Sequence, residues 1–186
     1  MTFDEIVSSR HSVRAFDPAR PVPQEAIVAM CEAARMAPSA CNAQVWRFIA
    51  VTDPELRRQI CMRGMGPILR NKFMRDAPLI IVGCADLDII ANKIGAKITG
   101  IEYYQLDMGI AMEHLVLKAT ELGLGTCWVG WINEESIREI LGIPKRARVM
   151  ALIAVGYSTE KAPTKRVRKP LRKLLFSDRW GTPCPE

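Results

Sequence analysis

The chain has 186 residues and a formal net charge of +6 at pH 7. Hydrophobic residues make up 49% of it, a globular share that excludes disordered and fibrous proteins. No apolar run is long enough to span a bilayer, and the N-terminus lacks the basic-then-apolar pattern of a signal peptide. We therefore expect a cytoplasmic protein with no membrane partner.

The six cysteines are scattered without a Cys-x-x-Cys pair, and the chain has only two histidines. This composition argues against a zinc or iron–sulfur site and favours buried free thiols, so we expect no metal. Basic residues cluster over residues 57–75 and 161–173, but no helix-turn-helix, finger or single-strand-binding signature accompanies them. We expect no nucleic-acid partner, and a basic surface that attracts anionic cofactors is the simpler explanation.

The chain begins with a capping box, because Glu5 follows Thr2 by three residues, and this predicts a helix over Phe3–Ser9. The next five residues are Arg10-His11-Ser12-Val13-Arg14. In an extended segment Arg10, Ser12 and Arg14 project the same way. Guanidinium and hydroxyl groups suit the oxygens of a phosphate. Taken alone, however, this pentapeptide fits a solvated basic turn better than a phosphate site.

A second helix is predicted from about Pro23 to Met36, with Ile27, Met30, Cys31 and Ala34 forming its apolar stripe. A loop of small residues then carries one hydroxyl and two carboxamides, from Ser39, Asn42 and Gln44. Carboxamides both donate and accept, which suits reading the edge of a heterocycle. The alternative is a turn in which Ser39 and Asn42 satisfy local backbone groups.

The remaining elements alternate between apolar strands and helices. The predicted strands are a buried one over Trp46–Val51, a central one over Pro78–Cys84, a short one leading to Gly130, and one over Arg148–Tyr157. The predicted helices run from Pro54 to about Asp76, interrupted near Gly64–Pro67, from Tyr103 to Leu122, and from Asn133 to Leu141. Periodicity does not decide the structure of Leu87–Gly100. The Tyr103–Leu122 helix is so widely apolar that it forms the core or a subunit interface, and His114 within it is read as a packing histidine.

Glycines between Gly123 and Gly130 follow a helix rather than a strand, which argues against a Rossmann nucleotide loop. Gly130, between Val129 and Trp131, suggests a close approach of the backbone to something flat and large. The last 29 residues, Ser158–Glu186, combine a basic, proline-punctuated stretch with apolar residues such as Phe176 and Trp180. Such apolar surface needs a cover, and we expect it to lie across a partner subunit.

The ordered motifs together resemble the nitroreductase family of flavin enzymes, over about the whole chain. They are Arg10–Phe16, Pro21–Pro23, Ala34–Trp46, Ala77-Pro78, Gly123–Gly130, Leu141–Pro144, Val155–Tyr157 and Arg166–Leu171. The resemblance implies an α+β fold, with a mixed sheet surrounded by helices in a single FMN-binding domain over residues 1–186. It also implies an intertwined homodimer that exchanges the C-terminal tails, residues 158–186, with FMN at the subunit interface.

The resemblance also implies roles for individual residues. Arg10, His11, Ser12 and Arg168, together with Arg166, would surround the FMN phosphate and ribityl chain, and Arg14 would lie toward N1 and O2 of the ring. From the other subunit, Pro38, Ser39, Asn42 and Gln44 would line the pyrimidine and the ring edge. Backbone groups at Val129 and Gly130, next to Trp128, would approach the N5 region.

The expected function is transfer of hydride from NADH or NADPH through flavin N5 to a small electron-poor acceptor, such as a nitroaromatic, quinone or enone. Because the chemistry takes place on the flavin, no catalytic side chain is expected. The alternatives are a flavin-binding storage or sensing protein without turnover, and a basic interaction module. The chain departs from the family pattern at Val45, where proline is usual, and at Glu113 and His114, where a Gln-Asn pair is common. Ile89–Gly100, where relatives build a substrate lid, carries no recognisable specificity signal.

Overall fold

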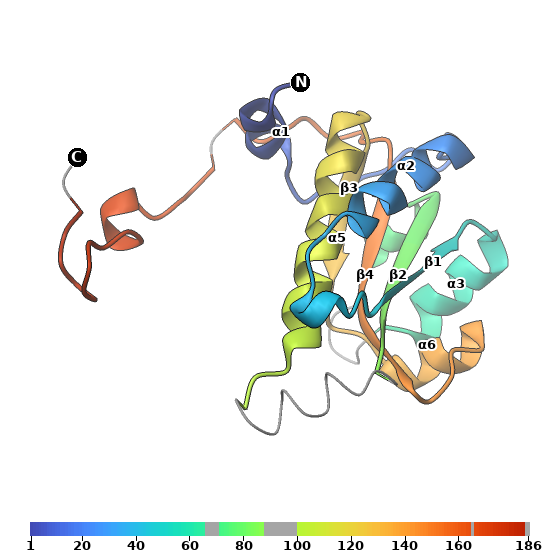
Figure 1. Cartoon of the computed structure of the whole chain (residues 1–186). Coiled ribbons are helices and arrows are strands. Elements are labelled where there is room, and N and C mark those ends of the chain that lie inside the picture. Colours follow the sequence, from blue (N-terminus) through green and yellow to red (C-terminus); the bar gives the residue numbers. More distant parts are fainter. Residues whose placement is uncertain (66–70, 88–99, 165, 185–186) are drawn as a thin grey trace.

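The fold is built on a four-stranded sheet in the order β1-β2-β4-β3 (Figure 1). The computed structural model describes residues 1–65, 71–87, 100–164 and 166–184. The strands are β1 (Trp46–Val51), β2 (Leu79–Asp86), β3 (Gly125–Val129) and β4 (Ala147–Gly156). This α+β architecture agrees with the expected fold class.

The expected mixed sheet is not what the strands form. All three pairings, β1 with β2, β2 with β4 and β3 with β4, are antiparallel. Among the described residues, the only parallel contact is an isolated bridge between Ser12 and Thr126. A single bridged residue is too short to form a strand, so the sheet proper is antiparallel.

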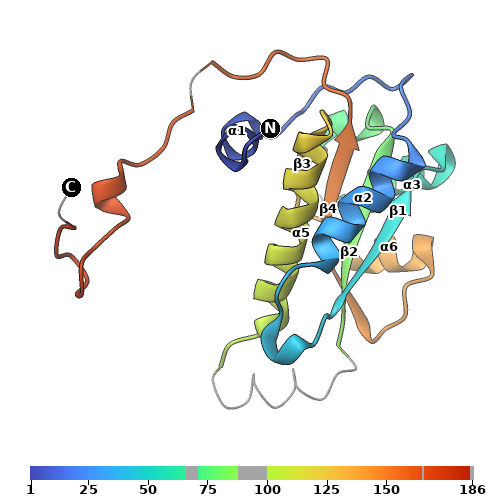
Figure 2. The same cartoon turned by 45° about the horizontal axis from the view of Figure 1, so that its top comes forward.

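Helices cover both faces of the sheet (Figures 1 and 2). On one face lie α2 (Gln24–Arg35) and α5 (Tyr103–Glu121), and on the other lie α3 (Pro54–Arg63) and α6 (Glu134–Leu141). Alternate residues of β2 point to opposite faces of the sheet. Leu79 and Ile81 pack with α2 and α5, and Ile80 and Val82 pack with α3 and α6. Burial on both faces explains why this central strand is apolar throughout, as predicted.

Most predicted element boundaries are confirmed within two residues. Helix α1 (Phe3–Ser9) carries the full capping box, with bonds of 2.7 and 3.3 Å between Thr2 and Glu5. Asn133 caps α6 through its side chain. The helix predicted from Pro54 ends at Arg63, and a short 3₁₀ turn follows over Lys72–Arg75. The undecided segment at Leu87–Gly100 lies almost entirely outside the described residues.

Strand β1 is an edge strand rather than a buried one, which corrects the sequence prediction. Only its ends, Trp46 and Val51, are buried, while Arg47 and Ala50 are exposed. Among the described residues the strand pairs with β2 alone, so the apolar sequence of β1 led to an overestimate of its burial.

The prediction for His114 is confirmed, whereas the prediction of buried cysteine thiols is confirmed only in part. His114 is half-buried, with ring Nδ1 3.2 Å from the Ala33 carbonyl oxygen, so it packs between α5 and α2 as expected. All six cysteines are free, but only Cys84 and Cys127 are buried, and Cys41 is exposed. The expectation of buried thiols therefore holds for two of the six.

The C-terminal tail leaves the sheet after β4, passes α1 and extends away from the rest of the chain (Figures 1 and 2). Its last part contacts mainly itself, as in the Phe176–Trp180 ring pair at 5.2 Å. Leu171 is 68% exposed and Trp180 94% exposed. One chain therefore leaves this apolar segment uncovered. No helix in the described part of the chain is long and apolar enough to cross a membrane.

Candidate functional site

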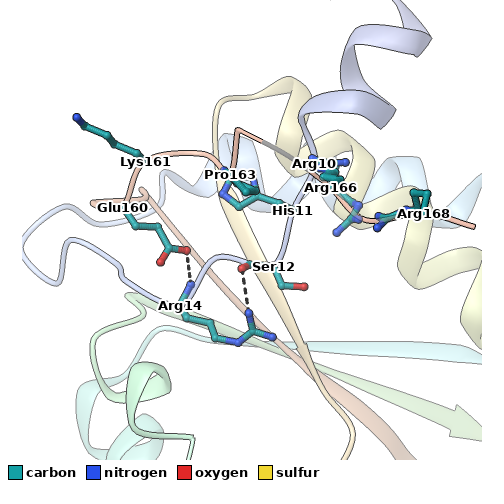
Figure 3. Close-up of a pocket in the computed structure, with 9 residues that line it drawn as sticks. All are labelled: Arg10, His11, Ser12, Arg14, Glu160, Lys161, Pro163, Arg166 and Arg168. Carbon is teal, nitrogen blue, oxygen red and sulfur yellow. Dashed lines mark hydrogen bonds between the residues drawn. The ribbon is translucent and has the colours of Figure 1, made fainter.

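A pocket of about 410 Å³ opens where residues 10–14 meet the segment that follows β4 (Figure 3). It brings together six residues that the sequence singled out: Arg10, His11, Ser12, Arg14, Arg166 and Arg168. Glu160, Lys161 and Pro163 complete the lining. The sequence analysis did not assign these three to the site. The basic stretch after β4 was the signal that could have pointed to them.

The first wall of the pocket is fixed by the end of α1 and by β3. The Arg10 N–H donates to the Ile6 carbonyl at 3.0 Å and closes α1. Val13 is buried, and its N–H donates to the Thr126 carbonyl at 2.9 Å. A Cβ on Gly125 would lie 2.7 Å from Cγ2 of Val13, so β3 needs a glycine here to let this segment approach. With Val13 held inward, its neighbours Ser12 and Arg14 are exposed.

The second wall is tied to the first over a long sequence separation. Ser158 bridges to Phe16, and the Thr159 N–H donates to the Ala15 carbonyl at 3.0 Å. Glu160 Oε1 then accepts the Arg14 backbone N–H at 2.8 Å. These contacts lay the chain after β4 alongside residues 14–16, and so carry Arg166 and Arg168 to the pocket.

The charges in the pocket are unbalanced. Arg10, Arg166 and Arg168 line the same pocket, and burial together with the repulsion of the other two guanidinium groups lowers the pKa of Arg166. Figure 3 shows them gathered on one side of the pocket. In the described part of the chain, none of the three forms an ion pair within 4.0 Å. Three guanidinium groups without a counter-ion are a donor set suited to a phosphate.

His11 adds a second kind of ligand contact. Its ring Nδ1 lies 3.0 Å from the Ser9 carbonyl oxygen, and since a carbonyl only accepts, Nδ1 carries the proton. Nε2 is buried and has no hydrogen-bond partner among the described residues. A buried nitrogen without a partner is costly, and a ligand hydroxyl would satisfy it. The pocket therefore fits a ligand that carries both a phosphate and hydroxyl groups.

The loop that carries Pro38, Ser39, Asn42 and Gln44 lies apart from this pocket. None of these residues lines it. Figure 1 shows the loop, which contains the 3₁₀ turn η1 (Ala40–Asn42), beside the first half of α5, whereas α1 lies near the other end of that helix. Residues 10–14 and residues 38–44 therefore do not form one site within a single chain.

The loop itself is strained and held by local contacts. Cys41, Asn42 and Gln44 have φ values of 51°, 53° and 46°, a region that non-glycine residues seldom adopt. The Ser39 hydroxyl accepts the Gln44 N–H at 3.0 Å, and Gln44 Nε2 donates to Asn42 Oδ1 at 2.9 Å. The predicted alternative, a turn that satisfies its own backbone, thus describes part of what Ser39 does.

The third predicted group stands at the end of β3. Val129 is buried, Trp128 is 37% exposed, and a Cβ on Gly130 would meet nothing within 4 Å in the described structure. The space beside Gly130 is therefore open. Burial raises the pKa of Glu113 in α5, while Arg10 and the Trp128 side chain oppose this shift. The sequence marked Glu113 as a departure from a family pattern without placing it.

Comparison with known proteins gives one consistent result. The model of the nitroreductase family matches residues 7–63 and 66–157. A putative NADH dehydrogenase/NAD(P)H nitroreductase from Methanothermobacter thermautotrophicus is 30% identical, over 95% of this chain and 86% of that protein. A nitroreductase family protein from Clostridium novyi NT is similar in structure, with a TM-score of 0.77 and 31% identity over 98% of this chain and 97% of that one. An FMN-dependent nitroreductase from Clostridium difficile R20291 has a TM-score of 0.77 and 27% identity, over 94% and 98%.

Proposed function

This chain belongs to the nitroreductase family, and on that basis we propose that it is an FMN-dependent oxidoreductase. It takes hydride from NADH or NADPH and passes it to a small electron-poor acceptor, such as a nitroaromatic, a quinone or an enone. Family membership supports flavin-dependent oxidoreductase chemistry in general. The printed names of two relatives, an NAD(P)H nitroreductase and an FMN-dependent nitroreductase, support the choice of donor and cofactor.

The observation that carries the proposal is a group of three arginines that form no ion pair within the described residues, beside a buried histidine nitrogen that has no hydrogen-bond partner there. FMN offers what these groups lack, a doubly charged phosphate and a chain of hydroxyls. We assign Arg10, Ser12, Arg166 and Arg168 to the phosphate, and His11 Nε2 to a ribityl hydroxyl. Charge-assisted hydrogen bonds of this kind are about twice as strong as neutral ones.

When bound, FMN supplies hydride acceptance and donation at N5. The chain's own residues hold and orient it. Arg14 is kept in the pocket by its backbone bond to Glu160 and by a 3.5 Å contact from its Nη1 to the Ser12 carbonyl. Its fixed positive charge would favour negative charge on a bound flavin ring, with no proton transfer by the protein. No side chain needs to act as nucleophile, acid or base.

A homodimer completes the proposed site. The loop over residues 38–44 lies away from the pocket of its own chain, so Pro38, Ser39, Asn42 and Gln44 reach a flavin only from a partner subunit. The exposed apolar tail, which includes Leu171 and Trp180, needs a cover that its own chain does not supply. An exchange of tails between two copies provides that cover.

The test is the visible spectrum of the purified protein before and after addition of NADH or NADPH without oxygen. We expect a flavin spectrum that bleaches. A bound flavin that stays oxidised with both donors would favour a storage or sensing protein without turnover. A colourless protein that takes up no added FMN would contradict the proposal.

A further inference from the structure

Two of the pocket arginines are attached to the C-terminal end of α1. The Arg10 N–H donates to the Ile6 carbonyl at 3.0 Å, and Nη1 of Arg166 donates to the Val7 carbonyl at 3.2 Å. Carbonyls in the last turn of a helix lack partners within the helix and carry partial negative charge, so a cationic side chain is favoured there. Figure 3 shows both arginines on the side of the pocket where α1 ends. The end of this helix therefore holds one residue from each wall of the pocket.

The bond from Arg166 to Val7 is important because the second wall has few other attachments. It joins residues 159 positions apart. Among the described residues, it is the only hydrogen bond that ties residues 161–164 and 166–168 to another part of the chain. Nη1 of Arg168, for comparison, donates at 2.9 Å to the carbonyl of its neighbour Val167. The position of the arginines that follow β4 therefore depends on the end of α1.

The hydrophobic core does not need α1. The helix has no buried residue, and its apolar side chains Phe3 and Val7 are 70% and 43% exposed. A helix of seven residues is not stable in water by its sequence alone. The capping box between Thr2 and Glu5 satisfies two backbone N–H groups of its first turn and so stabilises it. The capping box thus supports a helix whose end serves the pocket rather than the core.

We propose that α1 is a positioning element that makes the pocket selective for a phosphate, and that it acts through Arg10 and Arg166. The inference rests on the proposed function, because it takes FMN as the ligand. The formed helix keeps both arginines at the pocket, so FMN binds more tightly than riboflavin, which has the same ring and ribityl chain but no phosphate. An unwound helix loses this preference. Thr2 and Glu5, which do not line the pocket, therefore act on the cofactor from a distance.

The variants Ser8→Pro and Ser8→Ala separate the effect of the helix from that of the side chain. Ser8 is an exposed residue in the last turn of α1 and does not line the pocket. Proline at this position removes a helical N–H and pushes the preceding residue, Val7, out of helical geometry. Alanine keeps the helix, because it is the strongest helix former. Since α1 has no buried residue, we expect both variants to fold.

The experiment titrates full-length protein, freed of flavin by dialysis, with FMN and with riboflavin, and follows quenching of flavin fluorescence. We expect Ser8→Pro to bind FMN about tenfold or more weakly than the wild type, because charge-assisted contacts to the phosphate are misplaced. Riboflavin affinity should change by no more than about threefold, because riboflavin lacks the group that the arginines bind. Ser8→Ala should bind both flavins like the wild type.

A second pair of variants acts at the other end of α1. Thr2→Ala removes the hydroxyl that accepts the Glu5 N–H, whereas Thr2→Ser keeps a hydroxyl there. We expect Thr2→Ala to bind FMN about two- to fivefold more weakly, the effect of losing a helix cap, with riboflavin affinity unchanged. Thr2→Ser should restore the affinity of the wild type for FMN.

Three results would overturn the inference. Wild-type affinity for FMN in both Ser8→Pro and Thr2→Ala would overturn it and leave the proposed function intact. Equal weakening for FMN and riboflavin would show that α1 supports the whole site and not its phosphate end. A wild type that binds neither flavin would overturn both this inference and the proposed function.

Discussion

The buried carboxylate of Asp107 accepts a hydrogen bond from the backbone N–H of Ala40 across 3.0 Å. Asp107 belongs to the first half of α5 and is only 3% exposed, while Ala40 opens the strained turn of the loop over residues 38–44. The second carboxylate oxygen of Asp107, Oδ2, is buried and has no hydrogen-bond partner in the described structure. The core helix thus fixes the loop that we assign to the partner's flavin.

Removal of this carboxylate should loosen the loop. We expect Asp107→Ala to lower the free energy of unfolding by about 1–3 kcal/mol, because the Ala40 N–H loses its acceptor. Asp107→Asn keeps an oxygen at the same place and should lose less. Urea denaturation of the two variants measures the difference. Equal stability of wild type and Asp107→Ala would show that the bond does not hold the loop.

The arginines of the pocket should each contribute to FMN retention. Arg10→Ala and Arg168→Ala each remove a charge-assisted contact, worth roughly 1.5–3 kcal/mol, so we expect FMN to bind about tenfold or more weakly. Arg35→Ala serves as control, since Arg35 is an exposed residue of α2 that pairs with Glu32. Fluorescence titration gives the three affinities. Wild-type affinity in both pocket variants would refute the phosphate assignment.

The sequence predicted the elements well wherever a local signal decides them. Capping residues such as Thr2 and Asn133 act within one turn of the helices that they start, so they can be read directly. The apolar run of β1 misled, because burial of a strand depends on its neighbours in the sheet and not on its own residues. The mixed sheet that the family resemblance implied was also wrong, because all three strand pairings are antiparallel.

The residues of the candidate site also divide into those that a local sequence signal predicts and those that only the fold brings together. Arg10 and Ser12 were found because they lie in one short segment with an evident chemistry. Glu160 was missed, because its bond to Arg14 joins residues 146 positions apart and only the fold brings them together. Glu113 was noticed as a departure from the family pattern, but its half-buried environment depends on how α5 packs against its neighbours.

Two strand glycines should differ in their tolerance of a methyl group. A Cβ on Gly156 would lie 2.5 Å from Cδ of Pro78, a rigid ring, whereas one on Gly83 would meet the flexible end of Met112 at 2.6 Å. We expect Gly156→Ala to destabilise the fold by about 1–3 kcal/mol and Gly83→Ala by less. Thermal unfolding of both variants tests the order. The reverse order would show that the main chain near Pro78 yields more easily than Met112 does.

The buried thiol of Cys84 should be inert in the folded protein. Burial raises the pKa of Cys84 to about 11, and the side chain is 2% exposed, so little reactive thiolate forms near pH 8. We expect iodoacetamide to modify the exposed Cys41 and to spare Cys84 until the chain is unfolded, as peptide mass spectrometry can show.

The raised pKa of Cys84 also makes the stability of the fold depend on pH. The unfolded chain releases the Cys84 proton near the ordinary value of 9.0, before the folded chain does, so the protein should lose stability as pH rises from about 9 toward 11. Denaturant midpoints across this range should fall more steeply for the wild type than for Cys84→Ala. Parallel curves would mean that Cys84 makes no contribution.

The tail gives the sharpest test of the proposed dimer. Deletion of residues 171–186 removes exposed apolar residues such as Leu171 and Trp180 but keeps Arg166 and Arg168, which line the pocket. If two copies exchange these tails, the shortened chain loses apolar area that would be buried between subunits, and we expect a monomer by light scattering. It should also bind FMN more weakly, since the partner's residues 38–44 are no longer present. The proposal of tail exchange is falsified if the shortened chain remains a dimer at the same concentrations.

A milder variant, Trp180→Ser, should also shift the monomer–dimer equilibrium toward the monomer, because it replaces the most exposed aromatic side chain without shortening the tail.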